Sequence, residues 1–312
     1  MKKIAIIIPF LNEAESIPSL LQTLNTFFAD PKPYQAEVIF VNDGSSDDSA
    51  ALLKSSASLS FSMKLLSLSK NYGSHAALRA GIAHAEADYI CFQYADLQDP
   101  LTLIDQMFES CEKGSAICWA KRNSSENALG SRWMSAGYAS LMRRYVASNY
   151  PEQGFDIAMF SSKVQYWLNQ NIEGNSSIFL QLLTLGFKQS EVFYHKSMRK
   201  TGVSKWTFSR KIKLFIDSFV AFSYAPIRLV TIVGFGLFIA GIVYSSYLIG
   251  RRLLFNDLLA GWPVLLSILM IGFGITNISL GILAEYLWRT LDSTRNRPVF
   301  IVDEITEKNK HV

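Results

Sequence analysis

Two long uncharged apolar segments constrain the fold of this chain more than any other feature. Residues 229–249 form a run of 21 residues without a charge, and 263–284 form a run of 22 in which Asn277 is the one strongly polar side chain. Each run can cross a hydrocarbon core of about 30 Å as a helix that rises about 1.5 Å per residue. The sequence therefore predicts two transmembrane helices within a segment of about 227–290.

Basic residues around the two runs predict their orientation. The linker 250–262 contains only Arg251 and Arg252 as basic residues, whereas the outer flanks contain many more. Since Lys and Arg are enriched in cytoplasmic loops, we expect both chain termini in the cytoplasm. The chain is then expected to be a multi-pass protein of the cytoplasmic (inner) membrane, with a cytoplasmic tail at 291–312. Within this tail, we expect a short β-like segment at 298–302 that returns to the cytoplasmic domain.

The segment before the first run combines apolar and basic side chains. Within 204–226, aromatic and aliphatic residues alternate with Lys205, Arg210, Lys211 and Lys213. This pattern predicts one or two amphipathic helices that lie in the membrane interface. An ordinary helix packed on the neighbouring domain is the alternative for this segment.

Residues 1–203 alternate strand-like and helix-like segments. Short apolar runs typical of buried strands occupy 4–8, 37–41, 64–68 and 89–92. Segments with helical character occupy 12–28, 47–59 and 73–87. This order predicts an α/β domain with a mainly parallel sheet covered by helices. Ligands of such sheets bind beyond the carboxyl ends of the strands, and the polar clusters of this sequence follow its predicted strands.

Composition and cysteine content narrow the class of protein. The formal net charge is only +4, so we expect no nucleic-acid partner. Cys91, Cys111 and Cys118 lack the spacing of metal ligands. We expect all three to be buried reduced thiols of a cytoplasmic domain.

The polar cluster after the fourth predicted strand carries the strongest chemical signal. Tyr94–Pro100 directly follows the apolar run 89–92. Asp96 and Gln98 are two residues apart at the end of a strand, so their side chains are expected to point the same way. A carboxylate and a carboxamide in this arrangement suit a hard divalent cation held against a diphosphate.

Two other clusters are common turn chemistry when each is taken alone. The segment 42–47 follows the second strand, where Gly44 permits a tight turn and Asp43 can accept hydrogen bonds from a base or a ribose. The segment 9–13 follows the first strand, and Asn12 could simply cap the next helix.

In this order and spacing, however, the clusters resemble family 2 glycosyltransferases with a GT-A fold. The matching segments are 9–13, 42–47, 71–73 and 95–100. Later segments look like the polyprenyl-phosphate glycosyltransferase branch, which includes dolichyl-phosphate mannose synthase; they are 154–156 and 199–206. The two apolar runs and the motifs after them, at 281–287 and 297–298, are similar to the bactoprenol glucosyltransferase type.

The resemblance implies roles for individual residues. The nucleotide-sugar pocket is expected to be lined by Pro9, Asn12, Glu13, Asp43, Asn71, Gly73 and Asp96. Asp96 and Gln98 are expected to bind Mg²⁺ or Mn²⁺, which stabilises the departing nucleoside diphosphate. Asp156 occupies the position of the family's proposed catalytic aspartate. Because a lipid phosphate is already largely ionised, Asp156 could instead orient the sugar or the acceptor.

The acceptor phosphate requires cations beside the sugar. We expect it to be bound by Arg122, Arg132, Ser135, Arg199, Ser204 and Lys205. Arginine is favoured because its planar guanidinium group forms paired hydrogen bonds with phosphate.

One position departs from the family pattern. The family usually has an aspartate two residues before the metal-binding aspartate, and Tyr94 stands there in this chain. Any role of that aspartate in the nucleotide or metal site would then fall to Asp96 or Asp99 alone.

The expected function is inverting transfer of a sugar, glucose or a related hexose, from a UDP-linked donor to undecaprenyl phosphate or another polyprenyl phosphate. The product is expected to serve as a donor for cell-envelope glycan modification. A homo-oligomer is a further expectation, because the first apolar run has a small-residue face made by Gly234, Gly236 and Gly241.

Two alternatives remain open at this point. A processive polysaccharide synthase is disfavoured because the sequence 129–133 lacks the glutamine of the Gln-x-x-Arg-Trp motif. A non-catalytic membrane scaffold or sensor derived from a glycosyltransferase is the second alternative, and Tyr94 is its motivation.

Overall fold

The computed structural model divides the chain into two compact units. One unit comprises Met1–Ser218 together with Pro298–Val312, and the other comprises Phe219–Arg297. The residues that the structure describes are 1–57, 59–122, 140, 142–144, 150, 157–170, 177–194, 232, 236, 239, 243, 247, 250, 254, 262–295 and 297–310.

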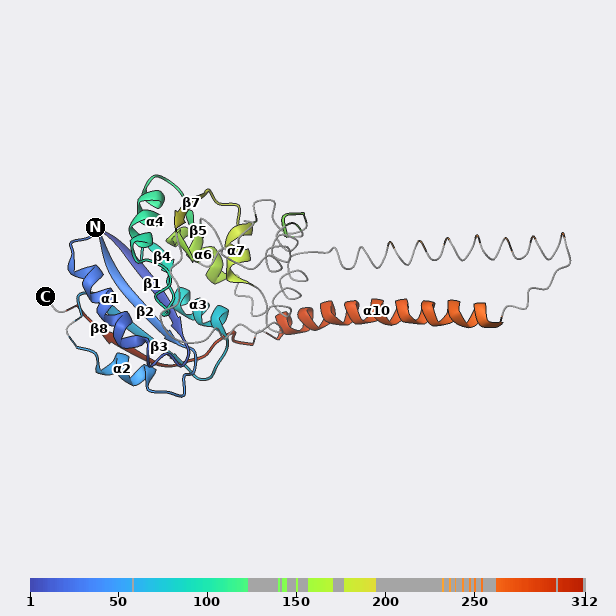
Figure 1. Cartoon of the computed structure of the whole chain (residues 1–312), viewed down its shortest axis with the longest axis horizontal. Coiled ribbons are helices and arrows are strands. Elements are labelled where there is room, and N and C mark those ends of the chain that lie inside the picture. Colours follow the sequence, from blue (N-terminus) through green and yellow to red (C-terminus); the bar gives the residue numbers. More distant parts are fainter. Residues whose placement is uncertain are drawn as a thin grey trace. The chain divides into compact units, whose positions relative to one another are not determined.

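An eight-stranded mixed sheet forms the centre of the first unit (Figure 1). Its strands are β1 (Lys2–Phe10), β2 (Tyr34–Asn42), β3 (Ser62–Leu68), β4 (Tyr89–Phe92), β5 (Ile117–Arg122), β6 (Ile157–Ser161), β7 (Gln189–Tyr194) and β8 (Val302–Lys308). The order across the sheet is β7-β5-β6-β4-β1-β2-β3-β8. Strands β1 to β4 are mutually parallel where they pair, whereas β6 and β8 run antiparallel to their neighbours. The predicted α/β sheet is thereby confirmed.

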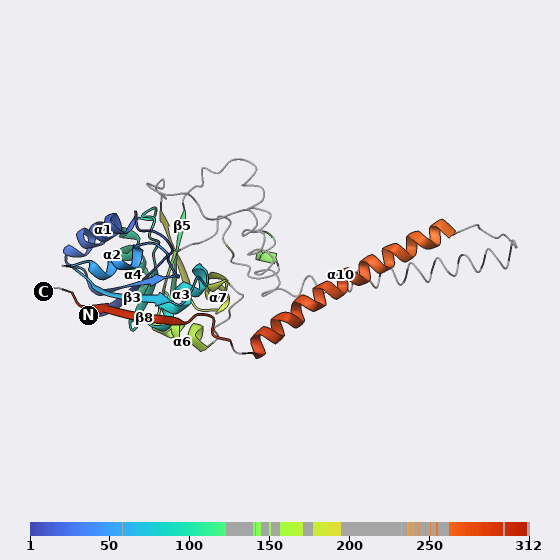
Figure 2. The ribbon, with the colours of Figure 1, turned by 90° about the horizontal axis from the view of Figure 1, so that it is seen from below.

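Helices cover both faces of the sheet. They are α1 (Ile17–Ala29), α2 (Ser49–Ser55), α3 (Ser74–Ala83), α4 (Thr102–Glu112), α6 (Ser162–Gln170) and α7 (Ile178–Thr184). Figure 2 shows α1 and α2 on one side of the sheet and α6 on the other. Ile4 to Ile8 in β1 have no exposed surface, as expected for a strand with both faces covered.

The packing of α3 on β1 is unusually close. A Cβ atom at Gly81 would lie 2.4 Å from Cγ2 of Ile7, so only glycine allows the helix this near the strand. On the other face, Ile4, Ile6 and Ile8 share one core with the apolar residues of α1 and α4. Cys91, Cys111 and Cys118 are buried and free, as the sequence predicted, and burial raises the pKa of each thiol.

The predicted helices begin too early or extend too far. Helix α1 starts at Ile17 rather than at 12, and α2 covers only Ser49–Ser55 of the predicted 47–59. The residues before each helix form loops whose polar groups bond across to other loops. The β-like segment expected at 298–302 was also placed too early, because the strand that returns to the sheet is β8 at Val302–Lys308.

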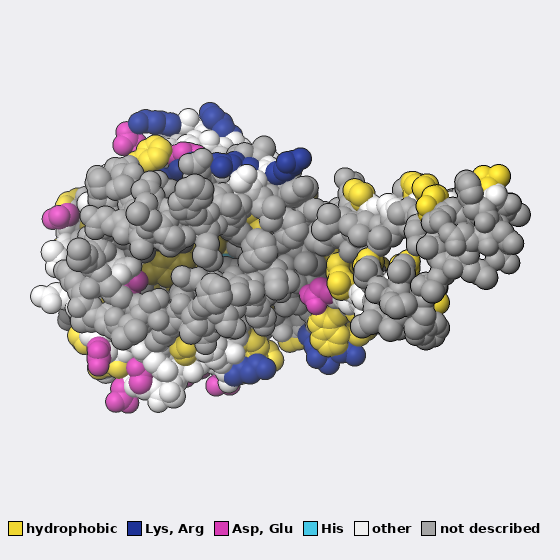
Figure 3. Space-filling view, turned by 45° about the vertical axis from the view of Figure 1, so that its right-hand side comes forward, with side chains coloured by type: hydrophobic (Ala, Val, Ile, Leu, Met, Phe, Trp, Pro, Cys, Tyr) yellow, Lys and Arg dark blue, Asp and Glu magenta, His cyan; other side chains and the backbone are white. Residues whose placement is uncertain are grey.

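The second unit contains the long helix α10 (Trp262–Thr294), which has 33 residues. Hydrophobic side chains are exposed along it, and Figure 3 shows such side chains at the surface of this unit. Among the described residues, no helix meets both the length and the hydropathy that a membrane span requires. Most of 229–249 and all of 204–226 lie outside the described residues, so the two spans and the amphipathic segment stay predictions.

Candidate functional site

Three loops meet at the carboxyl ends of β1, β2 and β3, where they are joined by hydrogen bonds. The Asn12 amide donates to Ser45 Oγ at 2.9 Å, and the Ser46 amide donates to Asn12 Oδ1 at 2.8 Å. Asn12 has a φ of +52°, a conformation that asparagine tolerates better than most residues. Asn12 therefore joins two loops and does not cap a helix.

A second set of bonds fixes the loop before α1 to the start of α2. The Glu13 amide donates to Ser49 Oγ at 2.9 Å, and the Ala14 amide donates to Asp47 Oδ2 at 3.1 Å. Burial would raise the pKa of Asp47, but the hydrogen bonds from Ser49 and Ala14 outweigh it and the pKa lies below its usual range. Asp47 is thus a loop-fixing carboxylate that the sequence did not single out.

Asp43 holds the third loop. Its carboxylate is only 4% exposed and accepts the amides of Tyr72 at 2.7 Å and Gly73 at 3.0 Å. Burial raises the pKa of Asp43, although the two amide bonds oppose that shift. A carboxylate offers about four acceptor positions, so Asp43 keeps capacity for a ligand while it holds the loop.

Gly44 lets the second and third loops touch. It has a φ of +71°, and a Cβ atom there would lie 2.5 Å from the carbonyl carbon of Lys70. The loops are therefore packed backbone against backbone at this point. Of the other predicted pocket residues, Pro9 is buried near the end of β1, whereas Asn71 is exposed and its Oδ1 accepts the Gly73 amide at 3.1 Å.

The turn after β4 presents Asp96 and Gln98. Oδ1 of Asp96 accepts the Gln98 amide at 3.2 Å, and Leu97 between them has a φ of +53°. Both residues are partly exposed, and the described residues form no other hydrogen bond with either side chain. The turn therefore keeps one carboxylate oxygen and one carboxamide available.

Asp99 holds the same turn from its buried side. This carboxylate is 2% exposed and its Oδ1 accepts the Tyr194 hydroxyl at 2.7 Å. The Asp99 carbonyl accepts Nε2 of Gln93 at 2.8 Å. Asp99 thus supports the turn from within the core, which leaves Asp96 as the carboxylate on its accessible side. Gln93 and Tyr194 were not predicted, and a polar residue at the end of the apolar run 89–92 was the only sequence signal.

The donor set of the turn fits a magnesium-type ion that also binds substrate phosphates. Mg²⁺ keeps several waters and is commonly held by one or two carboxylates plus a phosphate group. Asp96 supplies one carboxylate and Gln98 one amide oxygen. Within the described part of the chain, no cluster of three or more His, Cys, Asp or Glu residues is present to form a site from protein ligands alone.

The structure places few of the predicted acceptor residues. Arg122 is the last residue of β5, and its backbone is paired with Tyr194 of β7. The others lie outside the described residues, namely Arg132, Ser135, Arg199, Ser204 and Lys205, and so does Asp156, the expected catalytic aspartate. Strand β6 pairs antiparallel with β4, so its first residue, Ile157, lies at the edge of the sheet where the Asp96 turn begins. Asp156 immediately precedes it in the sequence.

Comparisons with known proteins identify the family of this chain. The model of Glycosyl transferase family 2 matches residues 5–167. Bactoprenol glucosyl transferase of Shigella phage SfII is 31% identical over 304 residues, which cover 96% of this chain and 97% of the relative. Undecaprenyl-phosphate 4-deoxy-4-formamido-L-arabinose transferase of Pseudomonas fluorescens (strain SBW25) is 32% identical over 310 residues, which cover 97% and 89%.

A solved structure, mannosyl-3-phosphoglycerate synthase from Rubrobacter xylanophilus, covers 69% of this chain and 71% of its own, with a TM-score of 0.47 and 11% identity. That likeness is too weak to add to the assignment. The family model, in contrast, covers the strands and loops that build the site, and both relatives align over nearly the full chain. This chain has a GT-A-like mixed sheet and belongs to glycosyl transferase family 2.

Proposed function

We propose that this enzyme transfers a sugar from a nucleoside-diphosphate sugar to the phosphate of undecaprenyl phosphate or another polyprenyl phosphate. The observation that carries the proposal is the pair of features at one edge of the sheet, the interlocked loops around Asp43 and the Asp96–Gln98 turn. The end-to-end similarity to two relatives whose names specify bactoprenol and undecaprenyl phosphate supports this acceptor class.

The interlocked loops are the proposed nucleotide end of the site. Asp43 binds the base or ribose with its remaining acceptor capacity, while Pro9, Asn12, Glu13, Asn71 and Gly73 form the surrounding surface. The donor is proposed to be UDP-linked glucose or a related hexose. The hydrogen bonds that fix these loops before any ligand binds reduce the entropy lost on binding.

The Asp96 turn is the proposed diphosphate end. Asp96 and Gln98 would hold Mg²⁺ or Mn²⁺, whose charge stabilises the diphosphate that leaves. In the reaction, a phosphate oxygen of the acceptor forms a bond to C1 of the sugar, and the bond from C1 to the nucleoside diphosphate breaks with inversion. Asp156 is proposed to orient the sugar or the acceptor, because the ionised phosphate needs no strong base.

The acceptor implies a membrane location, and we propose two spans at about 229–249 and 263–284. The uncharged runs and the exposed hydrophobic side chains of α10 support this proposal. The catalytic domain and both termini are proposed to lie in the cytoplasm. Arg122, Arg132, Ser135, Arg199, Ser204 and Lys205 are the residues proposed to bind the lipid phosphate.

A panel of nucleotide sugars tests the proposal. Purified full-length protein is incubated with undecaprenyl phosphate, Mg²⁺ and each donor, and the lipid products are analysed by mass spectrometry. We expect one donor class to yield a lipid heavier than the acceptor by one glycosyl residue, joined to the acceptor's own phosphate, with the nucleoside diphosphate as the second product. Oligosaccharide chains on any acceptor would instead indicate a processive synthase. Donor binding without a glycolipid product, under conditions where a known bactoprenol glucosyltransferase is active, would indicate a sensor.

A further inference from the structure

The strand β8 extends the sheet beside the nucleotide end of the site. It pairs antiparallel with β3, from Met63 opposite Lys308 to Leu68 opposite Val302. At the carboxyl end of β3, the Ser69 amide donates to the Ile301 carbonyl at 3.0 Å. Ser69 is followed by the loop whose Tyr72 and Gly73 amides bind Asp43. The backbone of β8 is thus bonded to the residue from which this loop departs.

Lys308 at the other end of β8 binds the end of helix α2. Its ammonium group donates to the carbonyls of Leu53 at 3.1 Å, Lys54 at 2.6 Å and Ser56 at 2.5 Å. The last carbonyls of a helix have no partner within the helix and carry partial negative charge, so a cation there satisfies and stabilises them. The opposite end of α2 begins at Ser49, which fixes the Glu13 amide.

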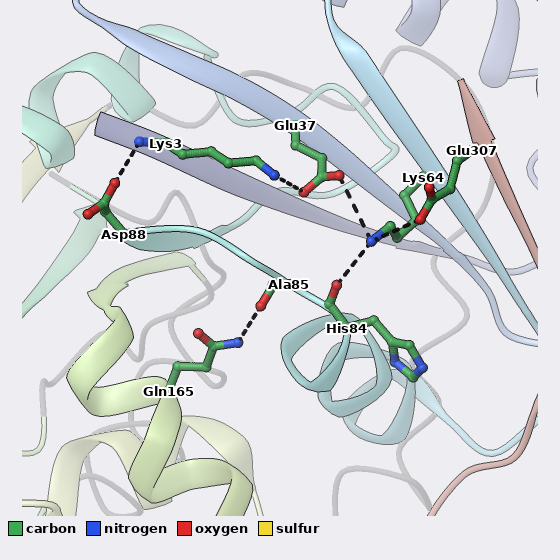
Figure 4. Close-up of polar contacts among 8 residues, drawn as sticks. All are labelled: Lys3, Glu37, Lys64, His84, Ala85, Asp88, Gln165 and Glu307. Carbon is green, nitrogen blue, oxygen red and sulfur yellow. Dashed lines mark hydrogen bonds and ion pairs between the residues drawn. The ribbon is translucent and has the colours of Figure 1, made fainter. Parts of the chain in front are cut away.

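Charged side chains set the position of β8 across four strands. Glu307 of β8 binds Lys64 of β3 at 3.1 Å, Lys64 lies 4.0 Å from Glu37 of β2, and Glu37 binds Lys3 of β1 at 3.1 Å. Figure 4 shows this alternating series, with Lys64 also donating to the His84 carbonyl. Lys64 and Glu37 are only 13% and 12% exposed, so solvent screens their interaction weakly. A shift of β8 by one residue would break the series.

We propose that β8 is a positioning element for nucleotide binding. It binds β3 and α2 together, and these two elements present the loops at 69–73 and 45–49. With β8 in place, the Tyr72 and Gly73 amides stay aligned on Asp43, and the donor meets a preformed pocket. The identity of the ligand rests on the proposed function, but the ordering of the loops by β8 does not.

The test uses the full-length protein with Lys308→Met, the conservative Lys308→Arg and the control Lys310→Met. Lys310 is exposed and lies two residues beyond Lys308. The first measurement is hydrogen exchange at Tyr72 and Gly73 without ligand. We expect about 10-fold faster exchange in Lys308→Met alone, with the amides of α1 and α4 unchanged. A β8 that merely covers the sheet edge would leave Tyr72 and Gly73 protected.

The second measurement is the Kd for UDP, with GDP as the alternative probe. We expect Lys308→Met to weaken nucleotide binding about 5-fold, to raise the KM for the donor similarly and to leave kcat at saturating donor within 2-fold. Unchanged exchange and unchanged Kd in Lys308→Met, and in a chain ending at Arg297 that still folds, would overturn the proposal. If wild-type protein bound nucleotide but formed no glycolipid, the proposed function would fail while the exchange result still decided the role of β8.

Discussion

The nucleotide end and the metal turn of the site are built in opposite ways. Around Asp43, the side chains of Ser45, Ser49, Asp47 and Asp43 each accept a backbone amide of another loop. At the Asp96 turn, the supporting bonds come from buried Asp99, Gln93 and Tyr194, while the side chains of Asp96 and Gln98 form no further hydrogen bond within the described part of the chain. The first region is therefore fixed by bonds between its loops, whereas the second has the donor set that suits the proposed cation with its phosphates.

The largest expected effect follows from removing the charge at the metal turn. We expect Asp96→Ala and Asp96→Asn each to lower kcat by about 10²–10³, the size of losing one strong electrostatic contact to the leaving group. Transfer of radiolabelled sugar to lipid is the measurement. The asparagine variant retains an oxygen for the Gln98 amide, so full activity in that variant alone would mean that Asp96 shapes the turn and binds no ion.

At the proposed nucleotide end, a side chain added at Gly44 should weaken nucleotide binding more than it slows the chemical step. Gly44→Ala places a Cβ atom 2.5 Å from the Lys70 backbone and penalises a left-handed φ, so we expect about 10-fold weaker UDP binding and about 2 kcal/mol less stability. Gly186→Ala is the matched control, because Gly186 has a similar φ of +74° but open space around it. Equal effects of the two variants on UDP binding would contradict the close packing of the loops.

The pH dependence of stability should report on His75, which lies in α3 directly after the loop at 69–73. Burial, together with the charge of Arg79, lowers the pKa of His75 to about 4. A base whose pKa is depressed in the folded state costs stability as pH falls from its unfolded pKa of about 6.5 towards 4, here about 3 kcal/mol. We expect urea unfolding to show this loss in the wild type and a smaller loss in His75→Gln. A slope that is identical in both proteins would assign the pH dependence to other groups.

The smallest effect is expected below the metal turn. Tyr194→Phe removes the hydroxyl that donates to Asp99, and loss of a hydrogen bond to a buried carboxylate should cost about 1–3 kcal/mol. Thermal unfolding should detect this change, and kcat should fall a few-fold while UDP binding stays the same. Tyr166→Phe is the control, since Tyr166 is 57% exposed. A loss of UDP binding as large as that of kcat would show that the two ends of the site are not independent.

Sequence patterns predicted those parts of the fold that depend on local order. The strand at 89–92 was predicted with its observed bounds, because an apolar run of four residues followed by turn residues is too short for a buried helix. The start of α1 was predicted five residues too early, because Asn12 and Glu13 bond to Ser45 and Ser49 instead of joining the helix. That choice depends on partners more than 30 residues away in the sequence.

The same limit applies to the site. Asp43, Asp96 and Gln98 were singled out because they follow predicted strands, and ligands of parallel sheets bind beyond the carboxyl ends of the strands. The partnership of Asp99 with Tyr194 joins positions 95 residues apart, and no periodicity reports it. Strand β8 was misplaced for a similar reason. Its sequence is mostly charged, and its position is fixed by Lys54, Lys64 and the end of α2.

The pairing of β8 with β3 also determines when the sheet can be completed during translation. Lys54 and Glu304 meet across 250 residues of sequence, so the edge of the sheet stays open while all of the intervening chain is made. Synthesis proceeds at about 5–20 residues per second, and both apolar runs leave the ribosome before β8 does. The last strand of the catalytic unit can therefore be added only after the membrane-length segments have been translated. An exposed β3 edge during that interval is a natural site for a chaperone to protect.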